Sequence, residues 1–513
     1  MNGEGTTRGT AEKRRLVANT FANGFSQFAS MLASLVFMPM LVASFGITTY
    51  GLFMLALSVT AYAALLDLGV GSALTKMVAE HTATGDRKQL TGVISSALLF
   101  YLAVGGVVAT AMAIVGALAG SIFHLPASQA VLMRNMLWIG AAFQLWYWPS
   151  STARHVLAGL QRYDVLGWTG LLATVLGIAA TLAVLVTGAG PVLLVALTGA
   201  VTSAVSLVNI GAAARLTPTG RGGHTVALAE PTATHFRAIF AFSWAIFVIQ
   251  VADVLFYQNT DRILLGIFAT ATAVGLYEAA AKFNVLLTYL SGVTVSAVLP
   301  LASSMGAEGR HASLRALFVR GTKYGSALIA PIAIVLAVFA GPIISAWLGP
   351  RFDGQGPVAV VLLLPHVLVC LGLMGDAIVI SQGRMAARIP YVFLQAVINV
   401  VVSALLIPRL GIIGVAIGTA VAHVVDFPIH IRFLLARTGV TLAAWLREVV
   451  APVYPLLVVP LAIAWALART GLAHSLPGIA FASAIALGAY WAAVYAIGLT
   501  TAERAELRGV LAR

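Results

Sequence analysis

Charged residues are scarce in this chain. Of its 513 residues only 9% are Asp, Glu, Lys or Arg, whereas 60% are hydrophobic, and the mean hydropathy is +0.97. Soluble domains use roughly 25% charged residues, so the shortage excludes an ordinary soluble protein. Long apolar segments take the place of the missing charge, and the sequence therefore predicts an all-α polytopic membrane protein.

The chain also lacks the residues of several kinds of site. Its single cysteine, Cys370, lies in an apolar segment, which excludes an intrachain disulfide. We find no metal-ligand spacing, no nucleophile–base pair and no phosphate-binding loop in the sequence. Gly69-Val70-Gly71 has neither the fixed glycine offsets nor the preceding strand that such a loop needs. These glycines instead predict a helix end that bends or packs closely against a neighbour.

The apolar segments have the length of transmembrane helices. After a polar N-terminal tail (1–15), the first segment runs without a charge from Leu16 to Val42, longer than the core of a secretory signal, which predicts an uncleaved first span. Each segment is near the ~20 residues that cross a hydrocarbon core of ~30 Å. Counting the first, the sequence predicts about fourteen spans, the others near 50–70, 90–118, 131–153, 165–187, 190–213, 237–266, 274–301, 321–347, 356–381, 389–408, 411–433, 449–468 and 475–499.

Positive charge is distributed unevenly between the predicted loops. If the N-terminus is cytoplasmic, most Lys and Arg residues fall in inner segments, and few lie near the outer face. This alternation predicts that both termini are cytoplasmic. The net charge of +13 is spread over many short loops without an aromatic-interleaved patch, so we expect no nucleic-acid partner.

Two parts of the chain resemble each other at a constant offset. "LDLGVGSALTKMVAEHTATGDRKQL" (66–90) aligns without a gap on "LSGVTVSAVLPLASSMGAEGRHASL" (290–314). An even number of predicted spans separates the copies, which predicts two six-helix lobes as parallel repeats about an axis along the membrane normal. The predicted domains are an N-lobe (16–213), a basic cytoplasmic inter-lobe loop (214–236), a C-lobe (237–437), and a C-terminal helix pair with a cytoplasmic tail (438–513).

Few ionisable residues fall inside the predicted spans, and each is a candidate functional residue because charge in a bilayer is costly. Asp253 lies two turns from Asp261 on the seventh span with Tyr257 between them, which suits a cavity wall. Glu278 and Lys282 are four residues apart on the eighth span. They either neutralise each other or serve transport, Lys282 by binding an anionic substrate and Glu278 by carrying a coupling cation.

Other candidates lie near the ends of spans. Arg134 begins the fourth span, which continues with "FQLWYWPSS" (143–151), and these aromatic rings either stack on sugars or face lipid. Asp67, at the inner end of the second span, either faces an aqueous cavity or reaches interfacial water. Asp376 and Asp426 lie near inner helix ends, within reach of water.

Three sequence motifs, taken in their order along the chain, resemble those of a known family. "FGITTYGLF" and "LDLGVGSALTKMVAEH" in the first lobe, and "TDRILLGIFATATAVGLYEAAAKF" in the second, are similar to the polysaccharide-export flippases of the multidrug/oligosaccharidyl-lipid/polysaccharide exporter superfamily. The resemblance covers roughly residues 12–437. It implies a bacterial inner-membrane transporter, and not an enzyme. Such a protein moves an undecaprenyl-pyrophosphate-linked oligosaccharide to the periplasmic leaflet by alternating access of two lobes.

The resemblance also implies the partners of the chain. These are the lipid-linked oligosaccharide, membrane lipids and a polysaccharide polymerase or export complex, with either a proton or sodium as coupling cation and no other cofactor. A strongly matching member has more basic residues in the first lobe than this chain has. The pyrophosphate site is therefore either Lys282 or the inner mouth, where the candidates are Lys76, Arg154 and Arg162, together with Asp67.

Three alternatives share part of this pattern. A multidrug exporter of the same superfamily would have the same lobes, and a peptidoglycan-precursor flippase would have a more cationic first lobe. A membrane polymerase or ligase acting on lipid-linked glycans usually has a large extracytoplasmic loop, whereas every outer loop predicted here is short. The sequence favours a transporter with a flippase mechanism and leaves the glycan undefined.

Overall fold

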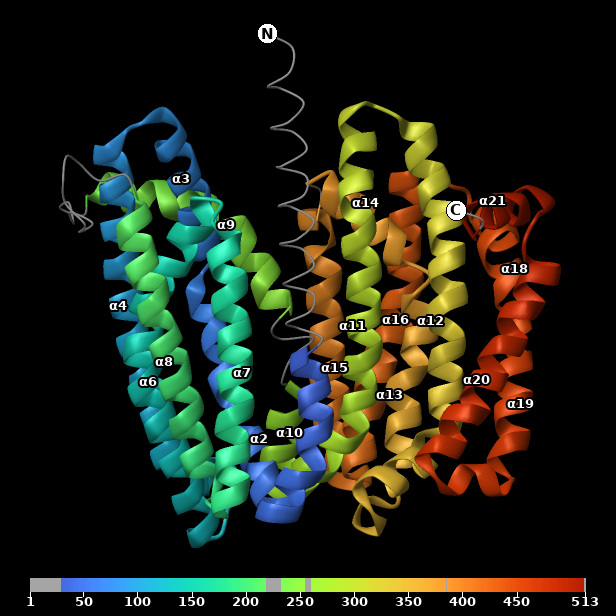
Figure 1. Cartoon of the computed structure of the whole chain (residues 1–513), viewed down its shortest axis with the longest axis horizontal. Coiled ribbons are helices and arrows are strands. Elements are labelled where there is room, and N and C mark those ends of the chain that lie inside the picture. Colours follow the sequence, from blue (N-terminus) through green and yellow to red (C-terminus); the bar gives the residue numbers. More distant parts are fainter. Residues whose placement is uncertain (1–28, 218–231, 254–259, 384, 512–513) are drawn as a thin grey trace. The chain divides into compact units, whose positions relative to one another are not determined.

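The computed structural model describes residues 29–217, 232–253, 260–383 and 385–511 (Figure 1). Within these ranges the chain is helical and has no strand, which confirms the predicted all-α fold class. The chain divides into two compact units. Unit 1 comprises Met1–Ile263 and Thr270–Thr272, and unit 2 comprises Leu264–Ala269 and Ala273–Arg513.

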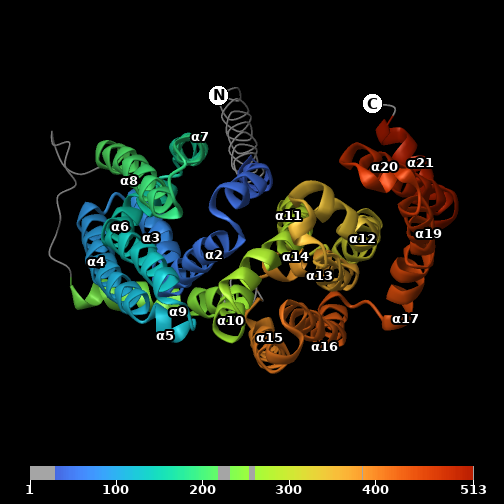
Figure 2. The ribbon, with the colours of Figure 1, turned by 90° about the horizontal axis from the view of Figure 1, so that it is seen from below.

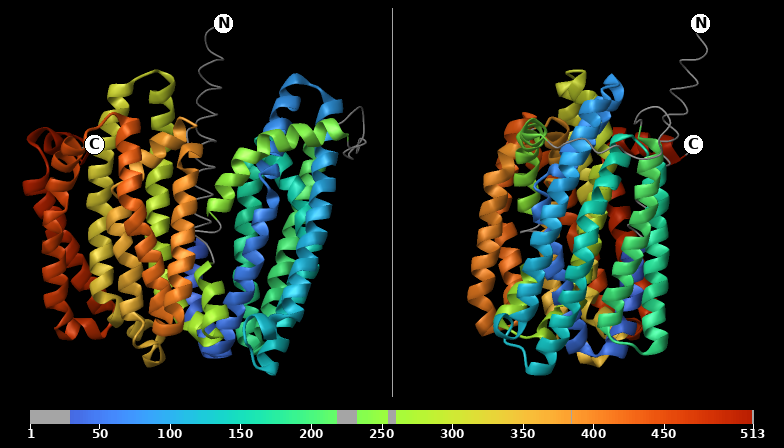
Figure 3. Two further views of the ribbon diagram at one scale, coloured as in Figure 1. Left: turned by 180° about the vertical axis from the view of Figure 1, so that it is seen from behind. Right: turned by 90° about the vertical axis from the view of Figure 1, so that its left-hand side faces the viewer.

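Unit 1 is a bundle of long apolar helices. Within it α4 packs along α6, α6 packs along α8, and α7 lies against α8 (Figures 1 and 3). A shorter apolar helix, Ala29–Phe45, precedes them. The elements are α2 (Ile47–Tyr62), η1 (Ala63–Asp67), α3 (Val70–Thr84), α4 (Arg87–Ala117), α5 (Ala119–Ile122), α6 (Ala127–Gly159), α7 (Tyr163–Thr187), α8 (Pro191–Leu216) and α9 (Ala233–Asp253), and α10 (Thr260–Phe268) runs from unit 1 into unit 2.

Unit 2 contains the remaining helices, among which α15 and α16 pack closely along their length (Figure 2). The helices α13 and α14 form a pair bent by 58° between Val369 and Leu373. The elements are α11 (Ala271–Ala307), α12 (His311–Leu348), η3 (Pro350–Phe352), α13 (Gly356–Val369), α14 (Leu373–Ser381), η4 (Met385–Arg388), α15 (Ile389–Leu410), α16 (Ile412–Thr438), α17 (Leu442–Trp445), η5 (Leu446–Val450), α18 (Ala451–Val453), η6 (Pro455–Leu457), α19 (Val458–Ala468), η7 (Gly471–His474), α20 (Leu476–Ala493), η8 (Val494–Gly498) and α21 (Thr501–Leu511).

Helices long and apolar enough to cross a membrane number ten in the described ranges, or eleven if the bent pair α13–α14 is one span. The predicted span near 131–153 is the central part of α6, which is not among the ten. The predicted span near 237–266 corresponds to α9 and α10 with residues 254–259 between them, outside the described ranges. The chain is thus a multi-pass membrane protein, and the number fourteen stays a prediction.

Two pairs of helices, one member in each half of the sequence, begin 224 residues apart, which is the offset at which 66–90 aligns on 290–314. The helices α2 and α11 begin at Ile47 and Ala271, and α4 and α12 begin at Arg87 and His311. Within unit 1, Thr48 and Thr272, which lie 224 residues apart, share a hydrogen bond of 2.8 Å. The local structure therefore repeats at these positions, while the arrangement of the two lobes about a membrane-normal axis stays a prediction.

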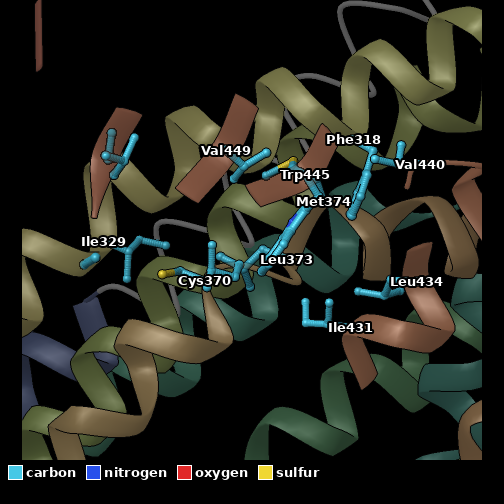
Figure 4. Close-up of a cluster of buried hydrophobic side chains, with 14 of the residues drawn as sticks. Phe318, Ile329, Cys370, Leu373, Met374, Ile431, Leu434, Val440, Trp445 and Val449 are labelled. Carbon is cyan, nitrogen blue, oxygen red and sulfur yellow. The ribbon is translucent and has the colours of Figure 1, made fainter. Parts of the chain in front are cut away.

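One apolar core in unit 2 joins the lobe to the C-terminal helices. Phe318 of α12, Met374 of α14 and Leu434 of α16 are buried in it. Trp445 and Val449, from the segment that opens the C-terminal helix pair, belong to the same core, as Figure 4 shows. The C-terminal helices are thus anchored in unit 2 by apolar packing, which between membrane-spanning helices acts through van der Waals contact.

The last helix, α21, is amphipathic and lies outside the candidate spans. Lys323 of α12 donates a hydrogen bond of 2.8 Å to Glu503 Oε2, and the Thr500 backbone N–H donates to the same oxygen at 2.8 Å. Burial raises the pKa of Glu503, but the hydrogen bonds from Lys323 and Thr500 outweigh it, and the pKa lies below its ordinary value. Arg504 also donates to Leu499 O at 3.1 Å, which ties α21 to the end of the preceding helical segment.

We expect α21 to loosen in acid. The folded pKa of Glu503 is lower than its unfolded value of about 4.3, so the carboxylate stabilises the attachment at every pH above the unfolded value. That contribution is lost as the pH falls through the folded value. Hydrogen–deuterium exchange of Thr501–Leu511, corrected for intrinsic rates, should be constant from neutral pH to about pH 5 and faster in more acidic buffer. Exchange equally slow at about pH 3, or the same acid response in Glu503→Gln, would contradict this assignment.

Candidate functional site

A cavity of about 520 Å³ lies within unit 1, between α2 and η1 on one side and α6 and α8 on the other. Its size is that of a small-molecule binding site. Its lining includes one acidic residue, Asp67, and two basic residues, Arg154 and His155. The wall also carries hydroxyl and amide groups and three aromatic rings, from Thr60, Ser72, Gln144, Ser151, Thr198, Thr202, Ser203, Phe143, Tyr147 and Trp148.

A break in the helix places Asp67 at this cavity. The 3-10 segment η1 ends at Asp67, and α3 begins at Val70. Between them Leu68 and Gly69 adopt left-handed φ angles of 50° and 75°. A left-handed residue with a side chain costs roughly 1–2 kcal/mol, which only Leu68 incurs because glycine has no Cβ. The glycine segment therefore bends the chain, as the sequence predicts.

Gly71 lets α3 and α6 approach each other. A Cβ at Gly71 would overlap the imidazole of His155. One turn along, Thr75 Oγ1 donates to Gly71 O at 2.9 Å and lies 3.4 Å from His155 O. Both roles expected of the glycines, bending and close packing, are thus confirmed at neighbouring positions.

Tyr101 of α4 holds the carboxylate of Asp67 in place. Its hydroxyl donates a hydrogen bond of 2.6 Å to Asp67 Oδ1, and the tyrosine is fully buried. The ring of Tyr101 stacks on Trp148, with centroids 5.8 Å apart, and on His155, with centroids 6.1 Å apart. Side chains from two helices, α4 and α6, therefore orient one carboxylate at the cavity.

Arg154 supplies the positive charge of the cavity. Its side chain is exposed, and within the described part of the chain no hydrogen bond or salt bridge holds its guanidinium. On the same wall Gln144 Oε1 and Trp148 Nε1 are buried without a hydrogen-bond partner among the described residues. The cavity thus offers a guanidinium to a polar, anionic ligand, and two buried polar atoms of its wall have no partner among the described residues.

The structure brings two of the predicted inner-mouth residues together at this cavity, Asp67 and Arg154. Lys76 lies elsewhere in unit 1, with its ammonium 4.4 Å from the centre of the Phe242 ring. Arg162 pairs with Asp164 at 2.8 Å on an exposed surface. Neither Lys76 nor Arg162 is among the residues that line the cavity.

The other predicted residues have different surroundings. Arg134 of α6 lies over the Trp138 ring, 5.1 Å from its centre. In unit 2 the Lys282 ammonium is 4.0 Å from Glu278 Oε2, and Glu278 is fully buried. Asp253 is the last residue of α9, a position at which the structure does not describe the side chain, and Tyr257 lies outside the described residues. The roles of these residues in transport stay predictions.

Sequence reasoning missed Tyr101, His155 and the polar face of α8. Tyr101 lies in an apolar run, and its hydroxyl meets Asp67 only through the packing of α4 beside the helix break. His155 follows Arg154 directly, and this adjacency is the one signal that could have marked it. Thr198, Thr202 and Ser203 are spaced along one helical face, a weaker signal in a chain rich in small residues.

A family model described as "Polysaccharide biosynthesis protein" matches residues 16–305. Among curated relatives, the probable low-salt glycan biosynthesis flippase Agl15 of Haloferax volcanii is 25% identical over 41% of this chain and 44% of its own length. The probable flippase AglR of the same organism is 26% identical over 42% of this chain and 45% of its own length. The matches thus span less than half the length of these relatives.

Solved structures share the fold. The lipid II flippase MurJ, in an inward closed conformation, has a TM-score of 0.65 at 13% identity and covers 93% of this chain and 99% of its own. A multidrug resistance MATE family transporter of the MOP superfamily, in an inward-facing conformation, has a TM-score of 0.64 at 15% identity and covers 82% of this chain and 94% of its own.

Proposed function

This chain belongs to the polysaccharide biosynthesis protein family, and we propose that it is a flippase that moves a lipid-linked glycan between membrane leaflets. The observation that carries the proposal is the cavity of unit 1, where the exposed guanidinium of Arg154 lies among hydroxyl groups and aromatic rings. The names of two relatives, probable flippases of which one serves glycan biosynthesis, support the same activity.

The lining of the cavity matches the chemistry of such a substrate. A lipid-linked glycan has phosphate groups and hydroxyls that cannot cross hydrocarbon unaided. A guanidinium binds phosphate through charge-assisted hydrogen bonds, which Arg154 is free to make because no salt bridge in the described residues engages it. Phe143 and Tyr147 offer rings against which sugars stack.

The finer proposal names the lipid and the membrane. The substrate is an undecaprenyl-pyrophosphate-linked oligosaccharide, moved across a bacterial inner membrane by alternating access for surface polysaccharide export. The chain itself is not an enzyme, both termini are cytoplasmic, and a polymerase or export complex receives the glycan. Motif resemblance and the distribution of positive charge support this version.

Leaflet transfer in proteoliposomes tests the proposal. The protein is reconstituted with fluorescent undecaprenyl-pyrophosphate oligosaccharide, and a membrane-impermeant quencher scores transfer. We expect Arg154→Gln to slow transfer by about 10- to 100-fold, because a hydrogen bond to a charged group contributes about 1.5–3 kcal/mol. Arg154→Lys should retain part of the rate, since it keeps the charge and loses the planar fork.

The matched control is Arg162→Gln. Arg162 follows α6, the helix that bears Arg154, but pairs with Asp164 and does not line the cavity, so its replacement should leave transfer near the wild-type rate. Lys282→Ala in the same assay tests the separate prediction that Lys282 binds an anionic substrate, and a wild-type rate in this variant would contradict it. Wild-type vesicles that transfer no glycan but release an organic cation would overturn the flippase in favour of a multidrug exporter.

A further inference from the structure

Unit 2 has a cavity of about 500 Å³ between the start of α15 and the end of α16, two helices that lie side by side in Figure 2. It shares no residue with the cavity of unit 1. Two arginines, two aromatic rings and two aliphatic side chains line it: Arg432, Arg437, Tyr391, Phe433, Ile429 and Ala436. We call it the α15–α16 basic cavity.

The different lengths of the two helices create this cavity. They form a hairpin at Gly411, so the first residues of α15 and the last residues of α16 lie at the same end. Because α15 has 22 residues and α16 has 27, α16 extends about 7 Å beyond the start of α15 at 1.5 Å per residue. Arg437 lies on this extension, and Arg432 lies about level with Tyr391. The cavity is therefore the step at which α15 begins beside the longer helix.

Aromatic rings support one of the two guanidinium groups. Arg437 Cζ lies 5.4 Å from the centre of the Phe433 ring, which is a cation–π contact. The Phe433 ring in turn packs against the ring of Tyr391, with centroids 6.3 Å apart. Side chains from both helices thus position the Arg437 guanidinium at the cavity.

No carboxylate neutralises these arginines in the described part of the chain. Arg432 and Arg437 are exposed, and no salt bridge or hydrogen bond among the described residues holds either guanidinium. The sequence of α15 has no acidic residue. The acidic residue of α16, Asp426, is buried and lies 3.7 Å from Arg388. The cavity therefore presents two positive charges, which complement a phosphate group.

Arginines near the end of a helix also have simpler roles. They interact favourably with the negative end of the helix dipole, and they mark the cytoplasmic side of a membrane protein. Neither role requires a cavity or a supporting aromatic ring. A basic pocket between two transmembrane helices is instead the arrangement that binds the headgroups of anionic lipids.

The depth of the cavity in the membrane favours a lipid. At 1.5 Å per residue the 27 residues of α16 span about 40 Å, more than the ~30 Å of a hydrocarbon core. The last turns of this helix therefore reach the headgroup layer. The distribution of positive charge predicts that this end of the helix is cytoplasmic.

An exposed apolar face continues from the cavity along α15. Leu394 lies three residues after Tyr391, on the same helix face, and Val397, Val401 and Leu405 follow at intervals of three to four residues. All four aliphatic side chains are exposed. From Tyr391 to Leu405 this face is about 21 Å long at 1.5 Å per residue. A phospholipid with its headgroup in the cavity can lay its acyl chains along this face, whereas a free phosphate has no use for it.

We propose that the α15–α16 basic cavity binds the phosphate headgroup of an anionic phospholipid. Arg432 and Arg437 bind the phosphate oxygens through charge-assisted hydrogen bonds, and the acyl chains lie on the exposed face of α15. The site stands on the geometry of unit 2 and does not depend on the flippase function proposed above.

Photo-crosslinking of the whole protein in nanodiscs tests the site. The probe is phosphatidylglycerol with a diazirine in the acyl chain close to the glycerol, present as a minor component in phosphatidylcholine, and labelled peptides are identified by mass spectrometry. We expect label on the first turns of α15, around Leu394. The same diazirine on phosphatidylcholine, which has no net charge, should label these turns several-fold less. Equal labelling by the two lipids would overturn recognition of an anionic headgroup.

Arginine variants test the two proposed contacts. Arg432→Gln and Arg437→Gln should each lower the labelling of α15 by about tenfold or more, because each removes a hydrogen bond to a charged group. Both side chains are exposed, so the variants should melt at the wild-type temperature, and lost label then reports lost binding. Full labelling of the double variant would overturn the site.

The matched control is Arg447→Gln. Arg447 is also exposed, lies in unit 2 on the predicted cytoplasmic side, pairs with Glu448 at 3.3 Å and does not line the cavity. Its replacement should leave the labelling of α15 unchanged. An equal loss in Arg447→Gln would show that overall surface charge, and not the cavity, attracts the lipid.

Inorganic phosphate separates a lipid site from a site for a free anion. Millimolar phosphate should leave the labelling unchanged, because it lacks the acyl chains that contact α15. Label that is lost in phosphate, but kept in chloride of equal ionic strength, would assign the cavity to a free anion and overturn the lipid site.

Discussion

Replacing Lys323 by methionine is expected to lower the free energy of unfolding by about 3 to 5 kcal/mol, because it leaves a buried carboxylate without its cation. The Lys323 ammonium lies 2.8 Å from Glu503 Oε2, and the two side chains are only 5% and 9% exposed. Methionine fills a similar volume, so the loss is electrostatic. The effect should appear as a lower apparent melting temperature of the purified protein in detergent.

Two further variants separate this electrostatic loss from a loss of packing. The double variant Lys323→Met with Glu503→Gln should recover most of the stability, since no unpaired charge remains. Arg320→Met removes a second ion pair between α12 and α21, the one between Arg320 and Glu506. Their charged atoms are 3.7 Å apart, and the two side chains are 58% and 67% exposed. Its loss should cost less than about 1 kcal/mol. Equal losses for Lys323→Met and Arg320→Met would refute the importance of burial.

Replacing Gly418 by valine is expected to separate α15 from α16 and to cost about 3 kcal/mol or more. A Cβ at Gly418 would lie 2.8 Å from Ser403 N and 3.1 Å from Asn399 O, and one at Gly414 would lie 2.7 Å from Leu406 C. These are backbone atoms, which cannot rotate away as a side chain can. Small residues four apart are the usual way in which membrane helices approach closely.

Gly488→Val serves as the matched control for Gly418→Val. Gly488 lies on α20, and a Cβ there would meet nothing within 4 Å, so the same substitution should be close to neutral. Melting temperature and the yield of monodisperse protein measure both variants. If Gly418→Val were as stable as Gly488→Val, the packing of α15 on α16 would be looser than the structure shows.

Hydrophobic patterning predicted much of the fold from local information. The run without charge that follows Arg87 and Lys88 becomes α4, and Asp86 caps this helix by accepting from Gln89 N at 3.0 Å. The backbone of a bilayer-spanning segment must satisfy its hydrogen bonds within the helix, so a long apolar run has few alternatives to helix. The apolar run over 356–381 continues unbroken through Cys370, so it gives no sign of the 58° bend between Val369 and Leu373.

The candidate site was predictable only in part. Asp67 and Arg154 were marked by their positions at span ends, but so were Lys76 and Arg162, which do not line the cavity. Nothing in the local sequence separates the two pairs, because all four are polar residues beside apolar runs. Which of the four residues reach the cavity depends on how α3 and α6 pack. Gly71 contributes to this packing because, having no Cβ, it leaves room for the His155 ring.

By itself, the sequence determined that this protein is a helical membrane protein. It also determined where most helices lie and where the chain bends near Gly69. Apolar runs and glycines affect the conformation of their own segment, so a local pattern is enough to predict these features. Only the tertiary structure decided which charges meet. Arg388 lies 12 residues from Asp376 and 42 from His430, yet all three share hydrogen bonds in one buried cluster. A side chain finds such partners through the rotation and approach of packed helices, which no local pattern specifies.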